Sequence, residues 1–149
     1  MFDRRQFIML APALIFAGPS LAESRRSSAI VTARALPHIN ALRTKAGRDE
    51  LIVDPVLERA ALDWSKEMAL QGKLSHRNFK RRMRKARIKG PAAENVAYGQ
   101  ANSKAAIIGW NGSRGHRRNM LGIYNRVGMA VAKNSNSGNR PYWTMILSV

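Results

Sequence analysis

The chain contains no cysteine among its 149 residues. This absence excludes the disulfide frameworks that stabilise many small extracellular domains. Acidic residues are also scarce: nine Asp and Glu stand against 26 Lys and Arg, which gives a formal charge of +17 at pH 7. Packing and hydrogen bonding must therefore stabilise the fold, and the expected ligands are anions.

The sequence also lacks a hydrophobic run long enough to cross a membrane. Its apolar run from Phe7 to Ala17 has 11 residues, is interrupted by Pro12, and is about half of the roughly 20 that a spanning helix needs. Arg4-Arg5 precedes this run, and small residues ending at Ala22 follow it, a pattern typical of a cleaved signal peptide. We expect residues 1–22 to be such a peptide, of either the twin-arginine or the general secretory type, and the protein to be periplasmic or secreted.

Removal of residues 1–22 would leave 127 residues with a formal charge of +16, since Arg4, Arg5 and Asp3 carry a net +1. This length predicts a polar leader at residues 23–29 and one domain at residues 30–149. Solubility alone needs a charge of only about 2–8 in a small domain. The excess favours anionic lipid headgroups, acidic envelope polymers or nucleic acid as partners.

Hydrophobic periodicity places most helices in the first half of the chain. A helical pattern over residues 30–46 ends at Gly47 and either kinks or begins at Pro37. A second helix is capped by Asp54 and stopped by Gly72. A short basic helix begins near Phe79, and Ser103 is expected to cap a fourth helix.

Strand patterns are concentrated in the second half. Residues 94–99 suggest a short strand, a turn at residues 112–115 leads into His116, and the segments 127–133 and 141–149 predict a hairpin around a loop of Asn, Ser and Gly. Helices followed by a terminal hairpin indicate an α+β domain with a small, mainly antiparallel sheet.

No HExxH, CxxC, Walker or GxSxG motif is present, so spacing alone identifies no catalytic or metal site. Three histidines occur, at positions 38, 76 and 116. His76, Glu94 and His116 each stand beside glycine, proline or small polar residues, where functional groups tend to be displayed. These three residues are the candidates for a site.

Six short motifs in this order resemble the CAP superfamily of cysteine-rich secretory, antigen 5 and pathogenesis-related proteins, in its bacterial, disulfide-free branch. The resemblance extends over residues 30–149 and rests on Asn40-x-x-Arg43, Leu57-x-x-Ala60-Ala61-x-x-Trp64 with Met68-Ala69, Leu74-Ser75-His76 with Phe79, Glu94-Asn95-Val96-Ala97, Trp110-x-x-Ser113-x-Gly115-His116-Arg117-x-Asn119-Met120-Leu121, and Gly128-Met129-Ala130-Val131 with Tyr142-Trp143.

The resemblance implies a three-layer α-β-α sandwich with a central antiparallel sheet, and a cleft lined by two histidines and two acids. His76 and His116 match the histidines and Glu94 matches one acid, whereas Ser113 stands where many members carry the second glutamate. Asn95, Trp110 and Asn119 are expected to have structural roles. The ligand-binding cleft would thus comprise His76, Glu94, Ser113 and His116.

Two kinds of chemistry are open to such a cleft. His76, His116 and Glu94 could provide three ligands to a divalent metal such as zinc, as in some members of the superfamily, or Glu94 could simply hold the histidines by hydrogen bonds. Alternatively, Ser113, His116 and Glu94 could act as a hydrolase triad, although no oxyanion hole can be inferred from the sequence.

Basic residues surround these candidates. Seven of the ten residues from position 80 to 89 are Lys or Arg, and no aromatic residue stands among them, which argues against a nucleic-acid surface. The expected anion-binding residues are Lys80, Arg81, Arg82, Arg84, Lys85, Arg87, Lys89, Arg114, Arg117 and Arg118.

Three functions remain open at this point. The sequence favours a non-enzymatic, exported domain that binds an anionic lipid or polymer through the cleft and its basic rim. A weak or metal-dependent hydrolase that uses the same cleft is the alternative. The third is a structural or toxin-like interaction protein in which the basic segment matters and the histidines do not.

Overall fold

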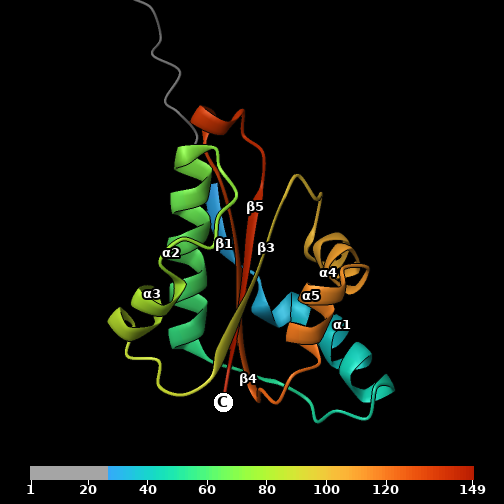
Figure 1. Cartoon of the computed structure of the whole chain (residues 1–149). Coiled ribbons are helices and arrows are strands. Elements are labelled where there is room, and N and C mark those ends of the chain that lie inside the picture. The colour runs from blue at the N-terminus through green and yellow to red at the C-terminus, as the bar shows by residue number, and fades with distance from the viewer. Residues whose placement is uncertain (1–26) are drawn as a thin grey trace, which may run out of the picture.

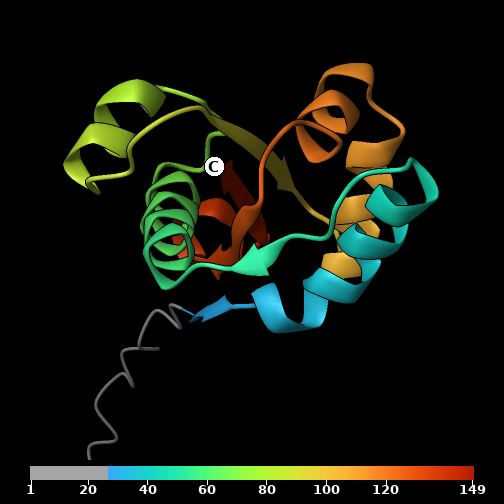
Figure 2. The same cartoon turned by 90° about the horizontal axis from the view of Figure 1, so that it is seen from below.

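The computed structural model describes residues 27–149, which form three layers with a five-stranded sheet in the middle (Figures 1 and 2). Four strands follow the order β1-β4-β5-β3, and all three pairings along this path are antiparallel. Their bounds are Ser27–Ile30 for β1, Ala92–Tyr98 for β3, Arg126–Lys133 for β4 and Tyr142–Ser148 for β5. The short strand β2, Ile52–Val53, pairs in parallel with the beginning of β4. This arrangement confirms the expected α+β sandwich.

Helices α2 (Pro55–Gln71) and α3 (Phe79–Lys85) cover one face of the sheet (Figure 1). The Asp54 side chain accepts hydrogen bonds from the first free N–H groups of α2, and Gly72 ends the helix in the left-handed conformation, as the sequence predicts. The Ser65 hydroxyl lies 2.9 Å from the Thr144 hydroxyl of β5. The helix begins so close to β4 that a Cβ atom built on Gly128 would lie 2.2 Å from the backbone nitrogen of Glu58.

Helices α1 (Thr32–Lys45), α4 (Ser103–Asn111) and α5 (Arg114–Met120) cover the opposite face. Their buried apolar side chains, including Ile39, Trp110 and Met120, join those of the sheet in the largest hydrophobic cluster. Pro37 lies inside α1 rather than at its start. Pro37 and Ala33 are both exposed, so water can bind the Ala33 carbonyl that proline leaves without an N–H donor.

Arg43 of α1 is buried, and no carboxylate within residues 27–149 forms an ion pair with it. Its guanidinium donates hydrogen bonds to four backbone carbonyls, those of Asp49, Met120, Gly122 and Tyr124, at 2.7 to 3.0 Å. Burial is the main cause that lowers the pKa of this side chain. The contacts fasten the segments that follow α1 and α5 to each other, and thereby fix the end of α5.

The outer edge of β3 is covered by side chains of α4 and α5. The Trp110 indole N–H donates to the Val96 carbonyl at 3.1 Å, and the Asn119 amide donates to the Glu94 carbonyl at 3.3 Å. These bonds occupy two carbonyls that would otherwise be open for strand pairing.

Several boundaries differ from the sequence predictions. Strand β1 includes residues 27–29, which were expected in the leader at residues 23–29, because their backbone pairs with β4. Asn102 caps α4, and the predicted cap Ser103 is the first residue of that helix. The turn expected at residues 112–115 is shorter, since α5 already begins at Arg114.

The expected signal peptide, residues 1–22, lies outside the described residues. Within residues 27–149, no helix is both long and apolar enough to cross a membrane.

Candidate functional site

Strand β3 presents alternate side chains to the two layers of helices. Its residues 93 and 97 join the cluster beneath α1 and α4, whereas Val96 packs on the α2 side. Glu94 follows the parity of Val96, and its cross-strand partner Ile146 also packs on the α2 side. The Glu94 carboxylate therefore lies beneath the segment that contains α3.

Two side chains bind this carboxylate. The Arg82 guanidinium of α3 forms a bidentate ion pair with it, with N–O distances of 2.7 and 3.0 Å. His76 Nδ1 lies 2.9 Å from Glu94 Oε1. The carboxylate is only 2% exposed, whereas the His76 ring is 54% exposed. We call His76, Arg82, Glu94 and His116 the Glu94 cluster.

Aromatic stacking holds Arg82 in place. The carbon atom of its guanidinium lies 3.8 Å from the centre of the Trp64 ring and 5.5 Å from that of Phe79. Its Nε–H donates to the Arg77 carbonyl at 3.1 Å, and the Trp64 indole N–H donates to the Ser75 carbonyl at 2.8 Å. The loop that carries His76 is thus attached to both α2 and α3.

His116 belongs to α5, which packs on the other face of the sheet. The Asn95 amide donates to the His116 carbonyl at 3.0 Å, and the Asn119 amide donates to the Asn95 side-chain oxygen at 2.9 Å. These bonds give Asn95 and Asn119 the structural roles that the sequence suggested. Burial lowers the pKa of His116, and repulsion from His76 lowers it further. The two histidines therefore influence each other across the edge of β3.

The donor set expected for zinc does not fit. Within residues 27–149 no group of three His, Cys, Asp or Glu side chains is arranged to hold a metal ion. The reason lies at Glu94: both of its oxygens bind the Arg82 guanidinium, so a metal at His76 and His116 would lack the third ligand. In this structure His76, His116 and Glu94 therefore do not form the expected metal site, because the Arg82 guanidinium binds and neutralises the Glu94 carboxylate.

The expected hydrolase triad is also not assembled. Glu94 orients His76, not His116, because its bond to an imidazole goes to His76 Nδ1. Ser113 precedes α5 at the N-cap position, where its side chain makes no capping hydrogen bond. Within the described part of the chain, no hydrogen bond joins Ser113 to His116. The serine therefore lacks the hydrogen-bonded base that activates a nucleophile.

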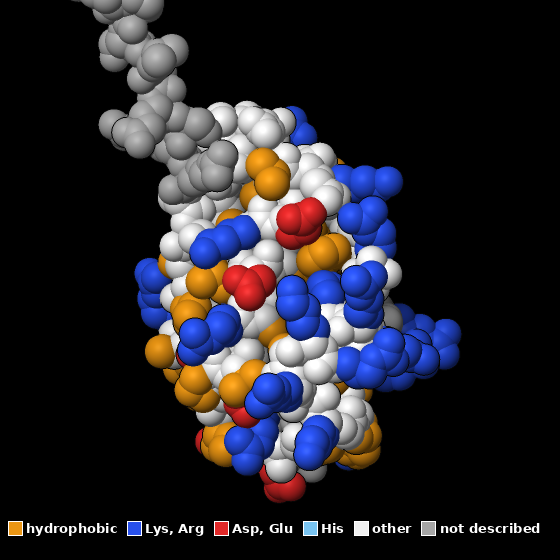
Figure 3. Space-filling view, turned by 90° about the vertical axis from the view of Figure 1, so that its left-hand side faces the viewer, with side chains coloured by type: hydrophobic (Ala, Val, Ile, Leu, Met, Phe, Trp, Pro, Cys, Tyr) orange, Lys and Arg blue, Asp and Glu red, His pale blue; other side chains and the backbone are white. Residues whose placement is uncertain are grey.

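The expected anion-binding residues differ in accessibility. Nine of the ten are exposed, whereas Arg82 is partly buried in the Glu94 cluster. Figure 3, which shows the face of α2 and α3, has many Lys and Arg side chains projecting into solvent. The nine residues form what we call the basic surface: Lys80, Arg81, Arg84, Lys85, Arg87 and Lys89 in and after α3, and Arg114, Arg117 and Arg118 in α5.

Sequence reasoning missed the individual role of Arg82. It appeared as one of seven basic residues in its segment, and nothing in the spacing distinguishes it from its neighbours. Trp64 was named as part of a family motif, and the structure shows that its ring supports the Arg82 guanidinium. A tryptophan and an arginine at unrelated sequence separations give no periodic signal, so this contact needed the fold.

Comparisons with known proteins identify the family of this chain. The sequence model described as "CAP: Cysteine-rich secretory protein family" matches residues 36–147. The uncharacterized membrane protein YlbC of Bacillus subtilis is 30% identical over 112 residues, which are 70% of this chain. The chain spans 30% of the length of that relative.

Solved structures share the fold. An outer surface protein of Borrelia burgdorferi superimposes with a TM-score of 0.69 at 17% identity, over 81% of this chain and 97% of that protein. An extracellular protein containing an SCP domain from Bacillus anthracis has a TM-score of 0.68 at 23% identity, over 78% of this chain and 39% of that protein. The chain thus belongs to the CAP family, and its lack of cysteine places it in the disulfide-free bacterial branch.

Proposed function

We propose that the protein is an exported, non-enzymatic domain that binds an anionic ligand of the cell envelope or of the extracellular space, either a lipid headgroup or an acidic polymer. The observation that carries the proposal is the bidentate pair of Arg82 and Glu94. It neutralises the carboxylate of the cluster. The groups left to meet a ligand are His76 and His116, with exposed arginines beside His116.

The charge distribution supports an anionic partner. The basic surface attracts anions over a distance of about 8–10 Å at moderate salt, and it raises their local concentration near the cluster. The His76 ring is exposed, and its Nδ1–H donates to the Glu94 carboxylate. Its Nε2 therefore donates a hydrogen bond to an anion only when the ring is protonated on both nitrogens. Export is supported by the signal pattern of residues 1–22 and by relatives described as outer surface and extracellular proteins.

Binding of the protein to phosphatidylcholine vesicles with and without phosphatidylglycerol, and to polyglutamate, tests this function. The Lys80→Glu/Arg81→Glu/Arg84→Glu variant is expected to bind at least tenfold more weakly, and added salt should weaken the wild type. The control Lys45→Glu/Arg48→Glu/Lys104→Glu changes the net charge equally but lies on α1, α4 and their loops. Equal losses in both variants would show a nonspecific charge effect and would refute the proposal.

The histidines provide the test against catalysis. The His76→Ala/His116→Ala variant should retain most of the salt-sensitive binding, because the basic surface remains intact and only the contacts of the two rings are lost. Wild type and variant are each incubated with envelope extract, and bound and released molecules are compared by mass spectrometry. Enrichment of an unchanged anionic molecule by both proteins supports a binding domain. New, mass-shifted products that appear only with intact histidines would make the cluster an active site and contradict the proposal.

A further inference from the structure

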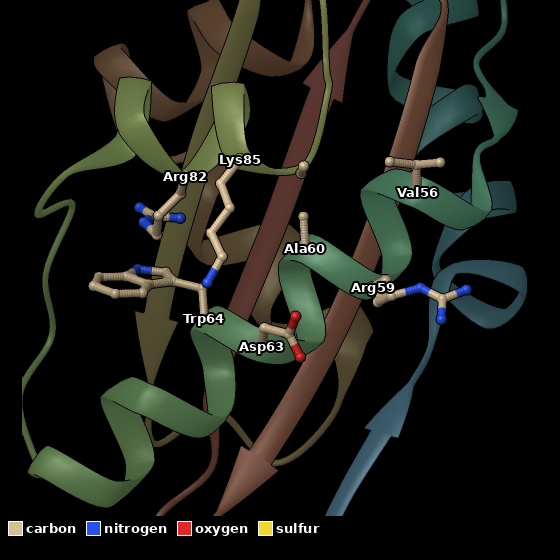
Figure 4. Close-up of a pocket in the computed structure, with 8 residues that line it drawn as sticks. Val56, Arg59, Ala60, Asp63, Trp64, Arg82 and Lys85 are labelled. Carbon is tan, nitrogen blue, oxygen red and sulfur yellow. The ribbon is translucent and has the colours of Figure 1, made fainter.

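A groove with a volume of about 460 Å³ separates α2 from α3 (Figure 4). This size lies within the range of about 300–1,000 Å³ that is usual for small-molecule sites. The groove is lined by Val56, Arg59, Ala60, Asp63 and Trp64 from α2, and by Arg82, Lys85 and Ala86 from α3 and its C-cap. Apart from Arg82, none of these residues belongs to the Glu94 cluster.

Small residues on the two helices explain why the groove is open. The α2 residues at positions 56, 59, 60, 63 and 64 share one face of the helix, as their spacing of three and four requires. Ala60 lies on this face and Ala86 lines the groove from the other side. Helix α3 packs through Met83, which is buried against Leu57 and Ala61, so the neighbouring positions of the pair are not filled.

The groove combines apolar walls with positive charge. Val56, Ala60 and Ala86 contribute aliphatic surface, and Trp64 contributes an aromatic ring. Arg82 is already neutralised by Glu94, so its guanidinium acts as a wall rather than as a free charge.

Two exposed cations and one acid remain at the groove. Figure 4 shows Lys85 extending from α3 toward α2, and Arg59 standing at the end of the groove away from Arg82. Asp63 is the acidic residue of the lining. The balance of free charge is therefore positive, which complements an anion.

We propose that this groove binds a single-chain anionic amphiphile. The apolar chain lies along Val56, Ala60 and Trp64, and the anionic headgroup binds Lys85 or Arg59. A purely polar anion would leave the apolar walls unused, and a neutral or cationic amphiphile would leave the free charges unpaired. The site is separate from the Glu94 cluster, and the proposal does not depend on the function proposed above.

Calorimetric titration of the full chain with decyl phosphate tests this site. Decyl maltoside, decyltrimethylammonium and inorganic phosphate serve as comparison probes, each used below its micelle concentration where it forms micelles. Decyl phosphate is expected to bind at least tenfold more tightly than any of the three. Equal affinity for inorganic phosphate, or for decyltrimethylammonium, would overturn the proposal.

Variants locate the binding. Ala60→Leu and Ala86→Leu, made separately in case one perturbs folding, should each fill the groove and weaken decyl phosphate binding about tenfold, a change of about 1.4 kcal/mol. Lys85→Glu should weaken it by at least as much, because repulsion replaces attraction. The control is Lys80→Glu, which makes the same charge change on α3 at a residue outside the groove lining. An equal loss of affinity in this control would show that decyl phosphate binds through the overall positive charge of the protein, and it would refute the proposed site.

Vesicle binding separates the two proposals. If the basic surface binds the bilayer, the folded Ala60→Leu variant should bind phosphatidylglycerol vesicles like the wild type. Weaker binding of decyl phosphate by the same variant then confirms that the groove binds free amphiphiles. If vesicle binding falls in parallel, the groove also takes its amphiphile from the bilayer. Unchanged decyl phosphate affinity in both groove-filling variants would refute the proposed amphiphile site but not the proposed function. Vesicle binding that is insensitive to salt would refute the proposed function but not the amphiphile site.

Discussion

Replacement of Glu94 by glutamine should destabilise the protein strongly, although it keeps the size and shape of the side chain. The Arg82 guanidinium would remain next to an uncharged amide, and breaking a buried ion pair by changing one partner costs about 3–5 kcal/mol. The Arg82 side chain is still 19% exposed, so the lower end of this range, about 3 kcal/mol, applies. This loss is a substantial part of the free energy of unfolding of a typical domain, which is roughly 5–15 kcal/mol.

The converse change should cost more. Arg82→Met would leave a carboxylate that is 2% exposed with His76 as its remaining side-chain partner, and would also remove the stacking on Trp64. We expect a loss of about 4 kcal/mol. The double variant Glu94→Gln/Arg82→Met should be destabilised by at least about 2 kcal/mol less than the sum of the two single changes, because it leaves no unpaired charge.

Urea unfolding followed by circular dichroism measures these differences as shifts of the midpoint at constant slope. His76→Ala is the matched control, since it removes one hydrogen bond from the same carboxylate at an exposed ring and should cost only about 0.5–1.5 kcal/mol. Single-variant losses below about 1 kcal/mol, with additive effects, would show that the pair behaves as an exposed salt bridge. That outcome would refute the inference that Arg82 closes the Glu94 carboxylate to other partners.

Four further predictions test other features. Gly128→Ala should lower the free energy of unfolding by about 3 kcal/mol or more, as a urea midpoint shift, because the new methyl group meets the α2 backbone. Arg43→Met should cost about 4 kcal/mol in the same assay, since four carbonyls lose their donor. His76→Ala should raise the pKa of His116 toward 6.5 in an NMR titration, because repulsion is removed. The free energy of unfolding should decrease as the pH falls below 6.5, since the native His116 binds its proton less readily than the unfolded chain does, and His116→Asn should reduce this dependence.

Two of these tests have an internal reference. Gly109→Ala introduces the same methyl group on α4, where a Cβ would meet nothing within 4 Å, so it should not destabilise. If Gly128→Ala is equally harmless, the close approach of α2 to β4 is wrong. His38 is exposed on α1 and serves as the reference in the titration. An unchanged His116 pKa in the His76→Ala variant would show that the two rings do not interact.

The sequence predicted most of the architecture because its signals are local. Asp54 and Gly72 mark the ends of α2, and alternation marks the terminal hairpin, so short-range preferences sufficed for these elements. Strands β1 and β2 were missed because their backbone pairing with β4 is set by the tertiary structure, and a two-residue strand such as Ile52–Val53 has no periodicity to detect.

The site was predicted in part. His76, Glu94 and His116 were identified from the motif resemblance, and the structure joins Glu94 directly to His76. The roles of these residues could not be predicted, because they depend on Arg82. Whether an arginine among seven basic residues points into solvent or onto a carboxylate depends on the Trp64 ring beneath it, which the chain brings from another helix. The zinc and hydrolase hypotheses both assumed that Glu94 was free.

The side chains of α4 and α5 that cover the edge of β3 affect the tendency of the protein to aggregate at high concentration. A neighbouring molecule could extend the sheet at this edge only after displacing the Trp110 and Asn119 side chains from the carbonyls that they occupy. Fibre growth by strand addition is therefore blocked at β3 by two neutral side chains rather than by charge. Screening of the basic residues by salt would leave this protection against aggregation intact.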